Sequence, residues 1–198
     1  MTYAIVESVA YDKIQYRKAL ENLVKDSDVF IYGSLAARSA TTRGTLLQLL
    51  DHADEKVFDV NLRAPFYNQE TVEMLLKKAS IVKMNHHELM EIAGWYSQRQ
   101  VEKEMMQALV EMFSFKMLIV TRGENGAAVF ANGSYYEHPG YEVAVVDTIG
   151  SGDAFLATFL ANHFKGNSMD LCLAKACKIG SLVASKKGAT PAFDANEY

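Results

Sequence analysis

The stretch that decides the fold is Val143-Ala-Val-Val-Asp-Thr-Ile-Gly-Ser-Gly-Asp-Ala-Phe155, which runs into a segment rich in Ala, Phe and Leu. Its pattern predicts a β-strand, a glycine-rich turn and a helix, in that order. At a helix start the first backbone N–H groups lack intrahelical partners and the macrodipole adds partial positive charge, so this turn can hold an anion. Gly150 and Gly152 would let the backbone approach that anion closely.

Asp153, in the first turn of the expected helix, has two interpretations. A carboxylate at a helix start can simply stabilise the helix. Beside a phosphate pocket, it can also take the proton of an attacking hydroxyl while N–H groups stabilise charge on the phosphoryl oxygens. Other phosphate-binding motifs fit less well, because G-x-x-x-x-G-K-[ST] is absent and Phe155 replaces the third glycine of a dinucleotide fingerprint.

The rest of the chain alternates short apolar runs with longer segments of helical spacing, which predicts a parallel or mixed sheet covered by helices. Expected strands are residues 3–9, 29–32, 57–60, 81–84 and 118–121, then a meander over 127–130, 134–137 and 142–146 with a tight turn at Asn132-Gly133. Expected helices are residues 16–24, 41–52, 70–79, 101–113, 152–163 and 171–186. No repeat or linker interrupts residues 1–198, so we expect a single α/β domain.

Composition argues against several classes of protein. The 20 basic and 24 acidic residues give a net charge of −4 without a long single-sign block, which argues against a nucleic-acid binder. No run approaches the ~20 apolar residues that span a bilayer, and the first residues lack the order of a signal peptide, so we expect a cytoplasmic protein without a membrane partner. Cys172 and Cys177 are the only cysteines and fall on different faces of an expected helix, which excludes a disulfide framework or a zinc quartet.

Asp147-Thr148-Ile149-Gly150-Ser151-Gly152-Asp153 resembles the D-T-x-G-x-G-D signature of the ribokinase or pfkB family of carbohydrate kinases. Four further segments follow in the family's order: Asp59-x-Asn61-x-Arg63, Asn85-x-x-Glu88, Thr121-Arg-Gly123-Glu-Asn-Gly126 and Gly188-Ala-Thr-Pro191. The resemblance covers essentially the whole chain. It is strongest to the fructokinase-like branch, through Tyr32-Gly-Ser-Leu35 and Phe58-Asp-Val-Asn-Leu-Arg-Ala-Pro65. It implies a three-layer ribokinase-like fold and ATP-dependent phosphorylation of a sugar hydroxyl, with a ketose such as fructose as the expected substrate.

The resemblance also implies roles for individual residues. Asp153 would be the general base that removes a proton from the sugar hydroxyl. The anion hole for the transferred phosphoryl group would be formed by Gly150, Ser151 and Gly152. The ATP molecule would be bordered by Thr121, Gly123 and Gly126.

Further implied roles concern phosphate and metal ions. Arg63 would pair with phosphate, since its planar guanidinium can make two bonds to oxygen. Asn85 and Glu88 match the family's N-x-x-E motif, which helps hold the ATP phosphates and Mg²⁺, the metal largely through water, as suits an ion that keeps much of its hydration shell. In some relatives a monovalent cation such as K⁺ lies near the positions of Asp147 and Ile149.

Taken singly, these segments also have structural interpretations. Asp59, Asn61 and Arg63 could form a solvated rim or a local turn at a strand end. Asn85 and Glu88 have the spacing of a helix N-cap and its capping-box acid. Residues 121–126 could be a hairpin connection with glycines at positive φ. The combination of all these segments in one order favours the kinase interpretation.

The front of the chain matches neither the family's early Gly-Gly sugar-binding motif nor its small β lid. We therefore expect a sheet that is incomplete at the N-terminus, without the lid, and with an open edge that another chain or a reorganisation of this chain would have to cover. A homo-oligomer is compatible with such an edge. Three functions remain: an ATP-dependent sugar kinase, a non-catalytic nucleotide-binding remnant of such a kinase and, with least support, a dinucleotide-binding Rossmann protein.

Overall fold

The computed structural model describes residues 5–192, and the strands in that part of the chain form one six-stranded sheet in the order β1-β2-β3-β4-β5-β6. The first four strands are parallel to one another. The fifth strand pairs antiparallel with the fourth, and the sixth pairs antiparallel with the fifth. Their bounds are β1 (Phe30–Gly33), β2 (Lys56–Asp59), β3 (Ile81–Asn85), β4 (Met117–Thr121), β5 (Ala127–Ala131) and β6 (Ser134–His138). The mixed sheet predicted from the alternation is confirmed, and these strands differ from the expected ranges by no more than one residue at either end.

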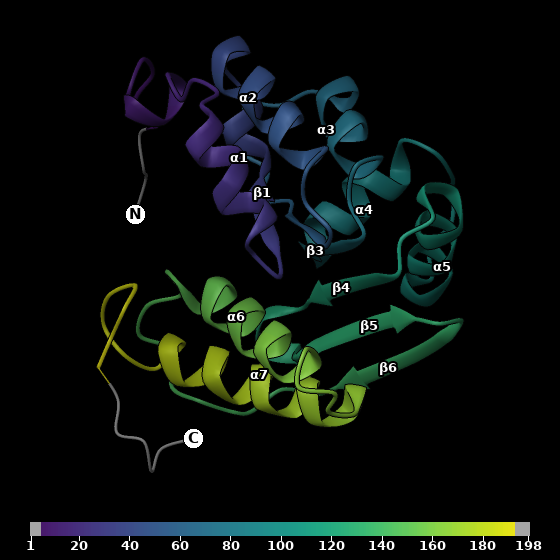
Figure 1. The fold of residues 1–198 in the computed structure, drawn as a ribbon. Coiled ribbons are helices and arrows are strands. Elements are labelled where there is room, and N and C mark those ends of the chain that lie inside the picture. The colour runs from purple at the N-terminus through teal and green to yellow at the C-terminus, as the bar shows by residue number, and fades with distance from the viewer. Residues whose placement is uncertain (1–4, 193–198) are drawn as a thin grey trace.

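Helices cover both faces of the sheet, so the fold has the three layers that were expected (Figure 1). One face carries α1 (Lys18–Lys25), α2 (Ala40–Leu50), α3 (Gln69–Leu76), α4 (His86–Gly94) and α5 (Glu102–Phe113). The other face carries α6 (Ser151–His163) and α7 (Met169–Ala184). Short 3₁₀ helices are η1 (Ala10–Asp12), η2 (Ser34–Ala37) and η3 (Gly123–Asn125).

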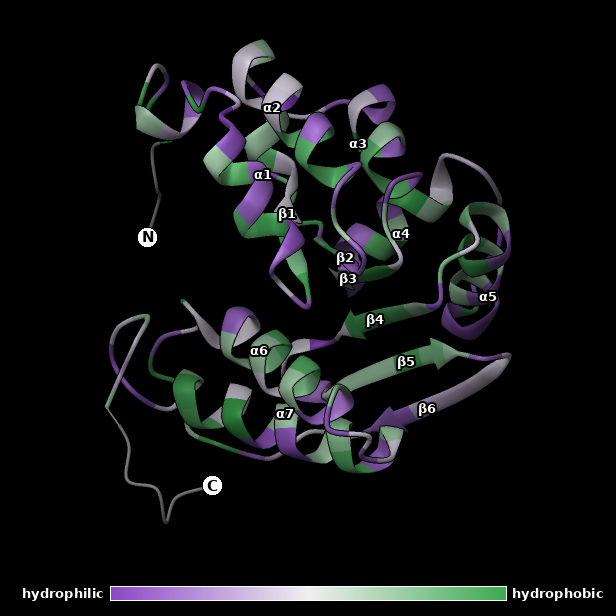
Figure 2. Ribbon diagram, in the orientation of Figure 1, coloured by the Kyte–Doolittle hydropathy of each residue, from purple (hydrophilic) through white to green (hydrophobic). Residues whose placement is uncertain are grey.

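Two hydrophobic cores result from the period of two along each strand. In β4, Leu118 and Val120 pack toward α5, whereas Met117 and Ile119 pack toward α6 and α7. Figure 2 accordingly shows β4 and β5 as strongly hydrophobic strands, the pattern expected when both faces of a strand are buried. The predicted turn at Asn132-Gly133 joins β5 to β6 with positive φ at both residues.

The predicted strand 3–9 is wrong for residues 5–9, which are irregular and lead into η1; residues 3 and 4 lie outside the described residues. Val6 is exposed, so the apolar run has no sheet to pack on. Arg38 instead fixes the segment, since it donates to the carbonyl of Val6 and to the carboxylate of Asp12. Within the described residues β1 therefore pairs only with β2 and leaves the expected open edge, where Ile31 is 47% exposed.

The predicted strand 142–146 is also wrong. This segment runs along α7 instead of joining the sheet, because the amides of Val146 and Asp147 both donate to the carbonyl of Ala184. Val145 and Val146 are exposed, so the β-branched residues that indicated a strand do not face a core. A strand, a turn and a helix were expected in this order, and the structure has an irregular segment, a turn and a helix.

No helix was predicted over residues 86–94, where α4 begins directly at the end of β3 with no loop between them. Its N-cap is Asn85, and Glu88 completes a capping box, so the structural interpretation of this pair is confirmed. None of the helices in residues 5–192 is both long and apolar enough to cross a membrane.

Candidate active site

The N-terminus of α6 is held against the Gly188 segment in one defined geometry. Gly150 caps the helix with a φ of 79°, and a Cβ added there would lie 2.2 Å from the carbonyl oxygen of Ala189. The carboxylate of Asp147 accepts hydrogen bonds from the amides of Ile149 (3.0 Å) and Gly188 (3.2 Å). Only glycine fits at position 150, and the turn before α6 is fixed by Asp147.

The first turn of α6 has the features of an anion-binding helix start. Within the described part of the chain, the amides of Gly152 and Asp153 donate to no protein acceptor. The helix macrodipole adds partial positive charge at the same point. Asp153 itself is exposed, so its carboxylate is open to a substrate.

A cavity of about 570 Å³ opens beside this turn. It brings together five of the predicted residues, from two segments far apart in the sequence. These are Thr121, Gly123 and Gly126 from the connection between β4 and β5, and Ser151 and Gly152 from α6. That connection is a hairpin with Gly123 and Gly126 at positive φ, as the structural interpretation of residues 121–126 expected.

Sequence reasoning missed another wall of the cavity, which is supplied by α7. Cys177, Gly180, Ser181 and Ala184 line it, at spacings of three and four that put them on one helix face. Gly180 lies in ordinary van der Waals range of α6, since a Cβ there would be 3.4 Å from the carbonyl oxygen of Ser151. The sequence pattern that could have indicated this wall is the run of small residues on one face of α7. Burial raises the pKa of the Cys177 thiol to about 11, so it lines the cavity as a neutral group.

A buried cluster of charged residues is formed by Asp59 at the end of β2, Lys83 in β3 and Glu88 in the first turn of α4. The ammonium of Lys83 donates to Asp59 Oδ1 at 2.9 Å, and the two residues are direct partners across the parallel strands. Burial raises the pKa of Asp59 despite the attraction of Lys83, and the nearby carboxylate of Asp153 raises it further. The buried cluster therefore lies within electrostatic reach of Asp153.

Asn85 and Glu88 hold each other through the start of α4. Asn85 Oδ1 accepts from the amide of Glu88 at 3.0 Å, and Glu88 Oε2 accepts from the amide of Asn85 at 2.9 Å. Glu88 Oε1 accepts from the amide of Leu62 at 2.8 Å. Burial raises the pKa of Glu88, while these amide donors oppose the rise.

These oxygens fit a water-mediated role toward Mg²⁺ better than direct coordination. Each carboxylate oxygen of Glu88 already accepts one backbone hydrogen bond, and its remaining lone pairs can accept from water on the metal. In the described part of the chain, no cluster of three or more His, Cys, Asp or Glu side chains could hold a metal ion by itself.

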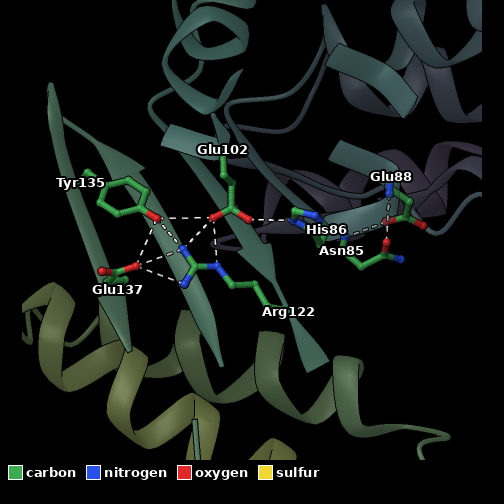
Figure 3. Close-up of polar contacts among 7 residues, drawn as sticks. All are labelled: Asn85, His86, Glu88, Glu102, Arg122, Tyr135 and Glu137. Carbon is green, nitrogen blue, oxygen red and sulfur yellow. Dashed lines mark hydrogen bonds and ion pairs between the residues drawn. The ribbon is translucent and has the colours of Figure 1, made fainter. Parts of the chain in front are cut away.

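A second set of polar residues lies beside this motif and reaches across to β6 (Figure 3). We call it the outer network; its members are His86, Glu102, Arg122, Tyr135 and Glu137. Glu102 lies between Arg122 and His86, and accepts from Arg122 Nη2 at 2.6 Å and from Arg122 Nε at 2.9 Å. Burial disfavours the ionised form of Glu102, but the hydrogen bonds from Arg122 and His86 outweigh it and hold the pKa of Glu102 below its ordinary value.

Arg63 does not join the other predicted residues. It is exposed, and its guanidinium donates to the carbonyl of Leu62. No hydrogen bond or ion pair links it to another candidate site residue within residues 5–192. Ile149 is also exposed, at the turn that Asp147 fixes.

Comparison with known proteins gives one consistent family. A sequence model described as pfkB family carbohydrate kinase matches residues 7–196. Probable fructokinase-5 of Arabidopsis thaliana is 28% identical over 191 residues, which cover 87% of this chain and 57% of that protein. The chain therefore spans a little over half the length of such a relative.

Solved structures share the fold. A Vibrio cholerae fructokinase with bound fructose, ADP and calcium has a TM-score of 0.71 at 25% identity, covering 81% of this chain and 56% of that chain. An Escherichia coli protein crystallised with ATP and Mg²⁺ has a TM-score of 0.75 at 21% identity, covering 85% of this chain and 56% of that chain.

Proposed function

The chain belongs to the pfkB family of carbohydrate kinases, and from this premise we propose that it transfers the terminal phosphoryl group of ATP to a sugar hydroxyl. The observation that carries the proposal is the cavity in which Thr121, Gly123 and Gly126 face the start of α6. A nucleotide bordered by those residues would direct its phosphates toward the amides of Gly152 and Asp153, which donate to no protein acceptor among the described residues. Family membership leaves the dinucleotide-binding alternative without support.

Asp153 is the general base in this proposal, and Gly150, Ser151 and Gly152 form the anion hole. The exposed carboxylate takes the proton as the hydroxyl oxygen attacks the γ-phosphorus. The α6 amides then stabilise charge on the phosphoryl oxygens. Asn85 and Glu88 would hold Mg²⁺ through water, and the metal would supply neutralising charge between the phosphates when bound. K⁺ beside Asp147 and Ile149 stays a prediction.

The proposed acceptor is a ketose such as fructose. Two segments favour it, residues 32–35 and 58–65, because both match the fructokinase-like branch. The names of relatives point the same way. Arg63 is the residue of these segments whose role has least support, because within residues 5–192 its guanidinium donates to the carbonyl of Leu62 and to no candidate site residue.

The test is ATP consumption by the purified chain with Mg²⁺ and a panel of sugars, for the wild type and D153N. The matched control is D170N, because Asp170 is an exposed acid in the first turn of α7. If Asp153 is the base, D153N lowers turnover by about 10²- to 10⁴-fold while D170N leaves it unchanged. Equal turnover in D153N and the wild type would contradict the assignment.

A second candidate is nucleotide binding without sugar turnover, which the cavity beside the start of α6 would also support. It is distinguished by calorimetry with ATP on the wild type and on C177F. The phenylalanine would extend from α7 into the cavity and weaken ATP binding. ATP binding that C177F abolishes, without turnover of any sugar by the wild type, would establish this second function.

A further inference from the structure

Lys83 is a lysine buried in the sheet with a single partner. It is 4% exposed, and Asp59 Oδ1 is the one acceptor of its ammonium among residues 5–192. An ammonium has three N–H bonds, so two remain available. Removing a charge from water costs several kcal/mol, and a buried ion pair often stabilises a fold no better than apolar residues of the same volume. Stability alone therefore gives little reason for a lysine here.

The ammonium of Lys83 lies at the end of the site where we expect the phosphates of ATP to bind. Lys83 lies near the carboxyl end of β3, where open α/β sheets bind ligands. An ideal Cβ on Gly152 would lie 3.3 Å from Lys83 Nζ. The ammonium thus abuts the first turn of α6, whose amides at Gly152 and Asp153 are unpaired in the described part of the chain. The absence of a side chain at Gly152 leaves the ammonium and this turn in direct proximity.

The need for a positive charge near the γ-phosphate also points to Lys83. Phosphoryl transfer needs positive charge near the γ-phosphate, and the cation expected from the sequence was Arg63. Arg63 is exposed and donates to the carbonyl of Leu62. Within the described residues, the ammonium of Lys83 lies beside the start of α6, 3.3 Å from the position that a Cβ on Gly152 would occupy.

We propose that Lys83 is a catalytic residue whose ammonium contacts the γ-phosphoryl oxygens of ATP, and that Asp59 is its positioning residue. The proposal rests on the proposed kinase function. In the reaction the sugar oxygen bonds to the γ-phosphorus, the bond from phosphorus to the β–γ bridging oxygen breaks, and ADP leaves with that electron pair. The hydroxyl proton goes to Asp153, and Lys83 stays protonated throughout.

The test compares two ligands by calorimetry in the presence of Mg²⁺: ADP, and the non-hydrolysable ATP analogue AMP-PNP, which has a γ-phosphate. The K83M variant is expected to bind AMP-PNP about 10- to 100-fold more weakly, the loss of one hydrogen bond to a charged group, and ADP as tightly as the wild type. The matched control is K78M, which removes the exposed ion pair of Lys78 with Asp51 and should change neither affinity. Turnover by K83M should fall about 10²- to 10³-fold.

The outcomes separate the two proposals. If the wild type binds neither ligand, the kinase function fails. If the wild type binds AMP-PNP and K83M changes both affinities equally or neither, the role of Lys83 is overturned while the kinase function stands. Should K83M fail to fold, the double variant D59L/K83M removes both charges of the pair and carries the same comparison of ADP with AMP-PNP.

Discussion

Two groups of charged residues lie near the start of α4, and they differ in their access to water. The buried cluster of Asp59, Lys83 and Glu88 is no more than 6% exposed at any residue. In the outer network the side chains of Arg122 and Glu102 are 19% and 16% exposed, and that of Glu137 is 59% exposed. Lys83 has one protein partner within the described residues, whereas Arg122 contacts Glu102, Tyr135 and Glu137.

The difference indicates that the charged residues of the buried cluster and those of the outer network have different roles in this fold. The outer network ties the start of α5 to β4 and β6, so its many hydrogen bonds hold the Gly123–Asn125 turn beside the cavity. The buried cluster connects strands that already pair through their backbones, so it adds little that the sheet lacks. We attribute the burial of these charges to a ligand, which could accept hydrogen bonds from the N–H groups of Lys83 that have no protein acceptor among the described residues.

The largest expected effect comes from breaking the buried pair. K83M leaves the Asp59 carboxylate without its partner, which should lower the free energy of unfolding by about 3–5 kcal/mol. D59L/K83M removes both charges and should lose much less, because apolar residues of similar volume replace a buried ion pair at little cost. Urea denaturation followed by circular dichroism measures both values. A single variant as stable as the double would show that the pair is not buried as described.

An intermediate effect is expected from the outer network. R122M removes hydrogen bonds to three side chains at a partly exposed site, so the free energy of unfolding should fall by about 1–2 kcal/mol. Salt at about 0.5 M should shrink the difference between R122M and the wild type, because exposed charges are screened. The same salt should leave the loss in K83M almost unchanged. Salt-independent destabilisation by R122M would contradict the distinction between the two groups.

Local patterns predicted the parts of this molecule that local interactions determine. The capping box of Asn85 and Glu88 and the turn at Asn132-Gly133 depend on residues within a few positions of each other, as does the hydrogen bond from the Ile149 amide to Asp147. Alternation located β1 to β6 within a residue, because each strand has apolar residues that reach a core.

The remaining features depend on packing between distant segments. The valines of residues 142–146 indicated a strand, yet the amides of Val146 and Asp147 donate to the carbonyl of Ala184 in α7. Lys83 sits in an apolar strand and carries no motif of its own; its relation to Gly152 arises only when α6 packs on β3. The cavity wall from Cys177 to Ala184 likewise depends on how α7 lies against α6.

The smallest expected effect is a pair of opposite pH dependences. The pKa of Glu102 is below its ordinary value of 4.5 in the folded chain, so the unfolded chain takes up more protons as the pH falls and the stability due to Glu102 is lost in acid. The pKa of Glu88 is raised, so its contribution is present below pH 4.5 and is lost as the pH rises through the folded value. E102Q and E88Q remove these two titrations while nearly keeping side-chain shape.

Urea denaturation in metal-free buffer from pH 7 to pH 4 separates the two groups. The stability advantage of the wild type over E102Q should shrink toward pH 4, by about 0.5–1 kcal/mol for a pair with partial solvent access. The stability of the wild type relative to E88Q should change in the opposite direction, increasing toward pH 4. Two curves that change in the same direction would mean that Glu88 and Glu102 experience the same balance of burial and partners, which the distinction between the buried cluster and the outer network does not allow.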